Sequence, residues 1–279
     1  IPAESIERIE VIDNPSAKYS PEGTAGIINI ILKRDRRAGY YGSLQAGGNQ
    51  QGGWNVSGNI NYSSKWVDAY ANLGRRRRKG NGGNESQQHY PLQDTFMNSE
   101  GDNSNKGRGT FGRAGLTFHL TGKDDLSLSG MTLQGKPSRD NVTEYDYGVL
   151  STGQILKHMT QSITAPKGKH EMYNAEMSYT HLFNEQGTHK LEASVEFNKW
   201  LMNSSTVYQN DTTFLAAAGS TVATAWSRQN RPMNMNYRSW EVKVDYENQL
   251  SQTLKLEAGY DGRFSHENTP QESWADYTS

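Results

Sequence analysis

The sequence predicts an all-β protein whose antiparallel up-and-down meander forms part of a transmembrane β-barrel. Three observations carry this prediction. Apolar and polar residues alternate over many segments, tight turns join these segments in pairs, and much longer polar segments separate the pairs. Alternation is typical of half-buried strands. Short turns at one rim with long loops at the other are typical of outer-membrane barrels.

The alternating segments each predict one strand, which gives about nine strands. In the clearest segment, Leu191–Asn198, the residues Leu, Ala, Val and Phe alternate with Glu, Ser, Glu and Asn. The full set of predicted strands is Tyr40–Gly48, Val56–Tyr62, Val67–Leu73, Leu116–Leu120, Leu126–Ser129, Tyr173–Tyr179, Leu191–Asn198, Val242–Glu247 and Leu254–Asp261.

Two kinds of connection join these strands. Tight hairpin turns are predicted at Ser63–Lys65, Thr121–Lys123, Asn184–Gly187 and Leu250–Gln252. Long polar loops are predicted near 79–108, 136–169 and 207–236. A compact soluble domain rarely has unstructured loops of more than about 12–15 residues. The regular alternation of short and long connections therefore favours a barrel, with the tight turns in the periplasm and the long loops outside the cell.

The two faces of the predicted strands differ in composition. The apolar face is rich in small residues such as Ala69, Ala71 and Ala175, which lipid tolerates better than a packed core does. The opposite face carries the charged residues Glu176, Glu192, Glu196, Lys243, Asp245, Glu247, Lys255 and Glu257. These charges favour a water-filled lumen, and the solvated side of a soluble sheet is the alternative.

Composition also excludes several classes of protein. The 279 residues carry 29 Lys+Arg and 30 Asp+Glu, a net charge of −1, which argues against a dedicated nucleic-acid binder. The absence of cysteine excludes disulfides and thiolate metal sites. The most apolar stretch, Ala25–Leu32, is much shorter than the roughly 20 residues of a membrane-spanning helix.

The first 34 residues have a different pattern from the rest. Their motifs are Ile-Glu-Arg-Ile-Glu-Val from Ile6, Asn-Pro-Ser-Ala-Lys-Tyr from Asn14 and Gly-Thr-Ala-Gly-Ile-Ile-Asn-Ile from Gly23. Asn14 and Pro15 mark a turn, and Gly23 and Gly26 permit a close backbone approach. Residues 27–32 are apolar on both faces, as in a fully buried strand.

This segment resembles the C-terminal end of the plug domain in TonB-dependent outer-membrane receptors, in the variant found in Bacteroidota. The plug motif is carried by Asn14, Pro15, Gly23, Gly26 and Asn29. The resemblance implies that residues 1–37 are the end of a small α/β plug and its linker, and that 38–279 begin the barrel. Barrels of that family have about 22 strands, so the sequence is expected to be a fragment of a longer chain.

The resemblance further implies the function. The protein is expected in the outer membrane of a Gram-negative bacterium, where a TonB-dependent receptor takes up a siderophore, glycan, peptide or metal complex. Its implied partners are the TonB energy-transducing complex, the nutrient ligand, outer-membrane lipid and lipopolysaccharide, and in some such systems a surface lipoprotein. A soluble or surface-attached β-rich module that binds glycans is the alternative, and an enzyme on a β-scaffold comes third.

Candidate binding residues follow from location alone. Tyr90, Tyr145, Tyr147 and Trp226 are aromatic residues of the long loops and are candidates for ligand contact. Arg75, Arg76, Arg77 and Arg78 fall where a strand leaves the outer leaflet, and guanidinium groups suit lipopolysaccharide phosphates. Simple solvation of a strand end is the alternative for these arginines.

Other motifs carry little weight. Gly107–Gly112 matches G-x-G-x-x-G, but a polar loop is predicted before it and a strand after it, whereas the dinucleotide motif needs a strand before it and a helix after it. The seven histidines are scattered without metal-ligand spacing. No nucleophile elbow or phosphate-binding loop occurs, so neither an enzyme nor a cofactor is expected.

Overall fold

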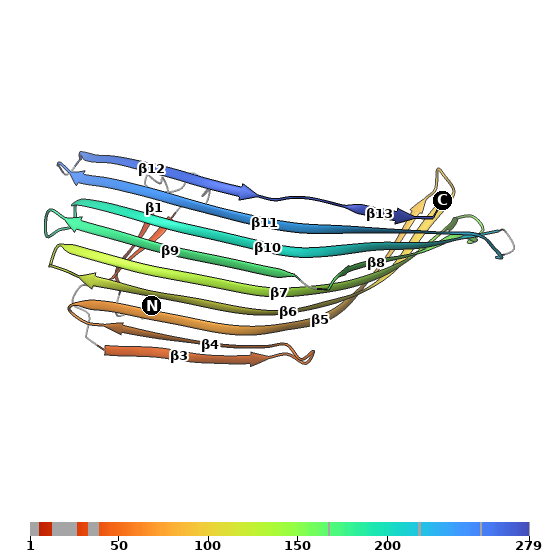
Figure 1. Cartoon of the computed structure of the whole chain (residues 1–279), viewed down its shortest axis with the longest axis horizontal. Helices are drawn as coiled ribbons and strands as arrows, with labels where there is room; N and C mark the ends of the chain where they lie inside the picture. The colour runs from red at the N-terminus through yellow and green to blue at the C-terminus, as the bar shows by residue number, and fades with distance from the viewer. Residues whose placement is uncertain are drawn as a thin grey trace.

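The computed structural model describes residues 6–12, 27–32, 39–166, 168–216, 219–251 and 253–278. These residues form two antiparallel sheets, one of two strands and one of 11 strands (Figure 1). The small sheet pairs β1 (Ile6–Ile12) with β2 (Ile27–Leu32). The strands of the large sheet are β3 (Gly39–Gly48), β4 (Trp54–Ser63), β5 (Val67–Tyr90), β6 (Thr95–His119), β7 (Asp124–Val149), β8 (Ile155–Ala165), β9 (Lys169–Leu182), β10 (His189–Leu215), β11 (Thr221–Gln249), β12 (Lys255–Asn268) and β13 (Trp274–Tyr277).

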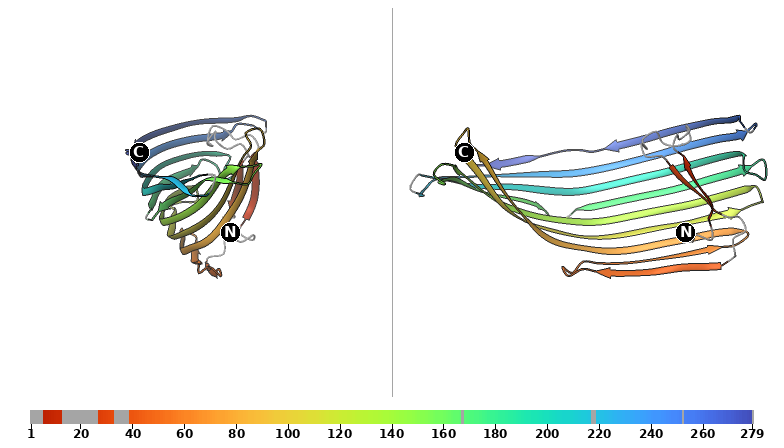
Figure 2. Two further views of the ribbon diagram at one scale, coloured as in Figure 1. Left: turned by 90° about the vertical axis from the view of Figure 1, so that its right-hand side faces the viewer. Right: turned by 180° about the vertical axis from the view of Figure 1, so that it is seen from behind.

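The large sheet is a meander with nine positions across it. β8 and β9 lie end to end between β7 and β10, and β12 and β13 both pair with β11 (Figure 1). Seen from one end, the sheet curls through an arc (Figure 2). The predicted all-β antiparallel meander is therefore confirmed, and all nine predicted strands lie in or overlap strands of this sheet.

The four predicted tight turns are also confirmed. They join β4 to β5, β6 to β7, β9 to β10 and β11 to β12, and all four lie at the same end of the sheet (Figure 1). We call this the short-turn end and the opposite end the hairpin tips.

The three long loops are a wrong prediction. Most of the residues in 79–108, 136–169 and 207–236 continue as paired strand, and β5, β6, β7, β10 and β11 each run for 24 to 29 residues. The connections at the hairpin tips are short, such as 91–94 between β5 and β6. The alternation of apolar and polar residues fades there because both faces of the strands are polar, although the backbone pairing continues without a break.

The small sheet covers only part of the plug resemblance. Asn29 lies in β2 opposite Glu10 of β1. Asn14, Pro15, Gly23 and Gly26 lie outside the described residues, as does the predicted boundary between 37 and 38. The strand over 27–32 is confirmed, and the plug assignment itself stays a prediction.

Strand register sorts the side chains of the large sheet onto two faces. Residues directly opposite each other on neighbouring strands point to the same side. One row on the apolar face runs Ile60, Ala71, Ala114, Gly130, Ala175, Phe197, Trp240 and Phe264. A row on the polar face runs Ser63, Asp68, Thr117, Ser127, Ser178, Ser194, Lys243 and Asp261. The predicted division into an apolar and a polar face is confirmed.

The apolar face is exposed. Ile60 is 55%, Leu73 65% and Phe264 64% accessible, and no side chain in the described residues is fully buried. A single layer of sheet cannot bury such side chains by itself, and a soluble domain normally packs them against a second layer. The exposed apolar rows span roughly Val67–Leu73 on β5 and Trp240–Tyr246 on β11, seven residues each, somewhat less than the roughly 9–11 residues of a tilted strand in the hydrocarbon.

Several glycines make room for aromatic rings on the polar face. A Cβ added at Gly115 would lie 2.5 Å from the ring of Tyr70, its partner on β5, and one added at Gly74 would lie 2.7 Å from the ring of Phe111 on β6. The rings therefore lie flat over the neighbouring glycines, which is a known way to compensate glycine in a sheet.

Among the described residues, no helix is both long and apolar enough to cross a membrane.

Candidate functional site

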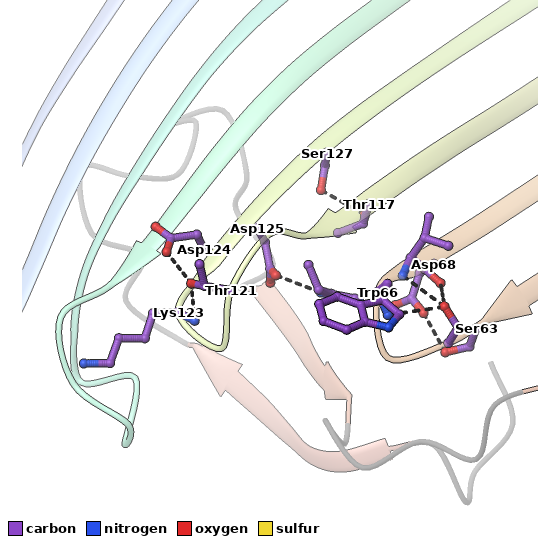
Figure 3. A network of polar contacts seen from close by, with 12 residues as sticks. Ser63, Trp66, Asp68, Thr117, Thr121, Lys123, Asp124, Asp125 and Ser127 are labelled. Atoms are coloured by element: carbon purple, nitrogen blue, oxygen red, sulfur yellow. Dashed lines mark hydrogen bonds and ion pairs between the residues drawn. The ribbon is translucent and has the colours of Figure 1, made fainter.

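The polar face is the candidate functional site, and it has three zones along the strands. The first zone is at the short-turn end, where hydrogen bonds link the starts of neighbouring hairpins (Figure 3). His119 bridges two carboxylates, with Nδ1 2.7 Å from Asp125 and Nε2 3.3 Å from Asp68. Asp68 also accepts a hydrogen bond from Ser63, and Thr117 lies 2.9 Å from Ser127. These contacts tie β4, β5, β6 and β7 together at one rim.

Asp124 supports the same rim from the apolar side of β7, below the membrane-spanning rows. Its carboxylate accepts hydrogen bonds from Thr121, from the Tyr179 hydroxyl at 2.6 Å and from His181 at 2.7 Å. These three hydrogen bonds, that of Thr121 first, hold the pKa of Asp124 well below its usual range.

The second zone lies at the level of the apolar band and is acidic. Glu176, Glu196 and Glu241 are direct neighbours on β9, β10 and β11. Glu196 accepts hydrogen bonds from Asn174 at 2.6 Å and Asn198 at 2.9 Å. Glu241 is buried between Lys243 and Arg263, whose guanidinium donates two hydrogen bonds to it. Side-chain pairing thus offsets the cost of placing these charges together.

The third zone contains a hollow of 740 Å³ above the apolar band. We call it the glycine pocket, because Gly107, Gly109 and Gly135 on β6 and β7 share the polar face there and carry no side chain. The charged and aromatic residues that line it from the polar face are Arg76, Arg78, Arg139, His170 and Trp200. Lys106, Arg108, Lys136 and Glu171 also border it, from strand positions that alternate to the outward face. The volume lies in the range typical of small-molecule sites.

The glycine pocket lies where the sheet is irregular. β8 ends at Ala165 opposite Arg139, and β9 resumes with His170 opposite Gly135, so one extra residue is inserted between β7 and β10. The amide of Gly168 donates to the carbonyl of Pro137 across this gap. Such bulges bend a strand and redirect side chains next to binding sites.

Three of the four predicted ligand-contact aromatics come together at the hairpin tips. Tyr145 and Tyr147 stack with ring centroids 6.2 Å apart, and the ammonium of Lys157 lies 3.7 Å from the centroid of Tyr147. Tyr90 shares this face, and burial, followed by the proximity of Tyr145 and Tyr90, raises the pKa of Tyr147. Trp226 lies opposite Asp211 on the other face, so the fourth residue is not part of this tyrosine cluster.

The structure divides the four predicted lipopolysaccharide residues between the two faces. Arg75 and Arg77 continue the apolar face above Leu73, whereas Arg76 and Arg78 point to the polar face and line the glycine pocket. Placing all four on one contact surface is therefore corrected, because successive residues of a strand alternate between faces.

Arg75 and Arg77 belong to a larger group on the outward side. Directly above the apolar rows, the same face carries the basic residues Arg75, Arg77, Lys79, Lys106, Arg108, Lys136, Lys199 and Arg238. We call this group the outer basic band.

Two further expectations are corrected. Gly107–Gly112 is strand throughout, within β6, so the preceding polar loop does not exist. His158, inside the predicted loop 136–169, lies in β8 and hydrogen-bonds to Asp146 at 2.7 Å. In the part of the chain that the structure describes, no three His, Asp or Glu residues converge as metal ligands.

Sequence reasoning missed the glycine pocket. Glycines two apart in a strand leave a hollow on one face, so Gly107 and Gly109 were a readable signal. Arg139, His170 and Trp200 had no comparable signal, because their place beside those glycines depends on strand register.

Comparison with known proteins gives one family match. Residues 181–273 match the family described as Outer membrane protein beta-barrel family, over β10, β11 and β12. No curated protein matches the chain. The match places the protein in the outer membrane of a Gram-negative bacterium, in agreement with the exposed apolar rows.

Proposed function

We propose that this chain forms part of the barrel wall of a TonB-dependent outer-membrane transporter, which takes up a nutrient ligand along the polar face. The observation that carries the proposal is the continuous polar face, which runs from the rim at the short-turn end to the tyrosine cluster behind an exposed apolar band. Transport requires such a wetted path through the hydrocarbon.

Two observations support the finer parts of the proposal. The resemblance of residues 1–34 to the plug end of TonB-dependent receptors supports the energy source. In the described sheet, β3 and β12 each pair with one neighbouring strand only, and a barrel in lipid leaves no backbone edge unpaired. Further strands are thus needed on both sides to close a lumen around a plug.

The test is uptake by living cells that carry the full-length protein. The probes are ferric citrate, cyanocobalamin, maltohexaose and a tripeptide, each radiolabelled. We expect uptake of one probe to be lost when the gene is deleted, when TonB is deleted and when a protonophore collapses the proton gradient. Uptake that survives loss of TonB, or an unchanged rate for every probe in the gene deletion, would contradict the proposal.

We also propose that the outer basic band contacts lipopolysaccharide phosphates. The band lies immediately above the exposed apolar rows, at the level of the lipid headgroups, and arginine binds phosphate through two parallel hydrogen bonds.

The chain offers a matched control for this contact. R75Q/R77Q removes two outward charges, and R76Q/R78Q removes two charges from the same strand on the opposite face. We expect only R75Q/R77Q to reduce co-purification of lipopolysaccharide with the full-length protein, measured by mass spectrometry of the purified complex. Equal losses in both variants, or failure of R75Q/R77Q to fold in neutral detergent, would argue against a specific contact.

A further inference from the structure

We propose that the glycine pocket binds a ligand that carries at least two anionic oxygen groups, carboxylates or phosphates, next to an apolar or ring-shaped part. This inference rests on the proposed transport function and adds the chemical class of the ligand.

Above the apolar band, the acidic side chains of β5 to β11 lie on one face only, whereas basic side chains lie on both faces. On β5 to β11, from the level of Leu133 to the hairpin tips, every described carboxylate within the strands points outward. These residues are Glu85, Glu100, Asp102, Asp140, Glu144, Asp146, Glu171 and Asp211. The polar face at the same levels carries Arg76, Arg78, Arg139, Lys157 and Arg231, with many asparagines and no carboxylate on these strands.

This arrangement attracts anions. Charges of one sign on a concave low-dielectric wall raise the local concentration of ligands of the opposite sign. The positive potential extends from Lys157 in the tyrosine cluster down to Arg76 in the glycine pocket, and below the pocket the acidic Glu176, Glu196 and Glu241 reverse its sign. An anion that enters from the hairpin tips would therefore be held at the pocket.

The guanidinium groups are available for a ligand. Within the described residues, Arg76, Arg78 and Arg139 form no ion pair. The Arg139 Nε donates to Asn105 Oδ1 at 3.2 Å, which orients the group and leaves its terminal nitrogens free for other acceptors. A carboxylate or phosphate can accept two parallel hydrogen bonds from each guanidinium.

The glycines supply the space. A Cβ added at Gly109 would lie 3.4 Å from Arg76 Nε, so the arginine side chain lies across this glycine. At Gly135 the nearest atom to an added Cβ is His170 Cβ at 3.9 Å, which leaves the floor of the pocket open. Trp200, Met172 and Leu133 form an apolar side of the same hollow, suited to a ring or hydrocarbon part of the ligand.

The test measures binding to the purified full-length protein in detergent free of lipopolysaccharide, by calorimetry. The probes are citrate, inorganic pyrophosphate and the neutral maltohexaose. We expect at least one anion to bind and the sugar not to bind, and the tighter anion identifies carboxylate or phosphate as the preferred group. R76Q/R78Q should weaken anion binding about tenfold or more, because hydrogen bonds to charged groups are lost.

Two controls make the result specific. R75Q/R77Q removes the same charge from the same strand on the outward face, and affinity should stay within about twofold because exposed distant charges are screened. Gly135→Val adds a side chain to the floor, where an added Cβ meets no atom closer than 3.9 Å, so we expect the protein to fold and to lose anion binding. Folding is checked by the heat-dependent electrophoretic mobility typical of outer-membrane barrels.

The inference is overturned if neither anion binds, if the neutral sugar binds as tightly as the anions, or if both arginine pairs weaken binding equally. These results differ from failure of the proposed function. TonB-dependent uptake of a neutral probe, unaffected by R76Q/R78Q, would overturn the anionic pocket and leave the transporter intact. Anion binding by the purified protein, without TonB-dependent uptake of any probe, would overturn the proposed transport function and leave the anionic pocket intact.

Discussion

At the scale of single residues, Asp124 shows how a turn is held. One carboxylate accepts hydrogen bonds from Thr121 in the turn, from Tyr179 and from His181 on β9. The side chain therefore connects the β6–β7 turn to the next hairpin along the sheet. The backbone supports the same junction, because the amide of Leu182 donates to the carbonyl of Lys123 at 2.8 Å.

Asp124→Asn should loosen this junction. The lowered pKa means that the folded protein binds the carboxyl proton less tightly than the unfolded chain does. The stabilisation is thus present above the ordinary aspartate pKa of 3.8 and is lost as the pH falls below that value. We expect faster hydrogen exchange at the Leu182 amide in the variant at neutral pH. Asp125→Asn, which removes a single contact to His119, should change this amide less.

For Tyr147 the expected pH dependence is opposite to that of Asp124, because stability is lost as the pH rises. The raised pKa of Tyr147 means that the folded hairpin holds the phenol proton more tightly than the unfolded chain, so the free energy of unfolding should fall as the pH rises above 10.0. Ultraviolet difference spectroscopy should show late ionisation of Tyr147 and of Tyr179, whose pKa is raised by its hydrogen bond to Asp124. Tyr145→Phe should shift only the Tyr147 step to lower pH. An ordinary titration of all tyrosines would contradict the burial of this ring.

The candidate ligand-contact residues were chosen from their position along the chain alone. Tyr90, Tyr145 and Tyr147 were chosen because all three are far from the apolar segments, and they share one face of the sheet at the hairpin tips. Trp226 was chosen by the same reasoning and faces the other way, since one position along a strand changes the face. The ligand role of these residues stays a prediction.

At the scale of strands and hairpins, glycine decides how closely neighbouring strands and rings approach. Gly148 near the β7–β8 turn is the tightest case, since an added Cβ would lie 2.1 Å from the Gln154 carbonyl oxygen and 2.6 Å from the Phe96 ring. Phe96 is one of the few buried apolar side chains of the described residues.

Gly148→Ala should therefore disrupt the hairpin tip, because the contacting carbonyl belongs to the backbone and cannot rotate away. We expect loss of protection from proteolysis between 148 and 155, measured by limited digestion of the purified protein. Gly153→Ala is the comparison: it has open space around the added Cβ and a φ of 69°, so its cost should be mainly backbone strain in the turn. Equal digestion of the first variant and the wild type would contradict the contact.

The length of the strands could not be predicted from periodicity. Within the hydrocarbon, lipid demands apolar residues on one face, and the sequence shows it, as in Val67–Leu73. Above the membrane both faces are wetted, so Lys79–Tyr90 carries no alternation although it pairs residue for residue with β6. Hairpin pairing there depends on backbone hydrogen bonds and cross-strand contacts that a polar composition does not reveal.

At the scale of the whole molecule, the sheet has a defined direction across the membrane. If the tight turns are periplasmic, the hairpin tips lie outside the cell. These 279 residues contain no cysteine, so they add no background to single-cysteine labelling. We expect Gln93→Cys at a hairpin tip to react with a membrane-impermeant maleimide in intact cells, and Lys123→Cys at the short-turn end to react only after lysis. The opposite pattern would reverse the orientation and with it the proposed entry path.

The sequence predicted the antiparallel meander, but these residues do not give the number of strands that close the barrel. Alternation and paired turns identified the meander, and the residues that match the barrel family lie in the last third of the chain. The first 38 residues contribute only β1 and β2 to the described structure, so the plug relies on sequence resemblance. How many strands close the barrel depends on the partners of β3 and β12.

The division of Arg75–Arg78 between two faces has a consequence for how this strand tolerates change. Loss or gain of one residue in a strand normally sends every following side chain to the wrong side. Within a run of four identical residues, a shift by one position still leaves arginines on both sides. Within this run, a shift of one position would therefore keep positive charge on both faces of β5.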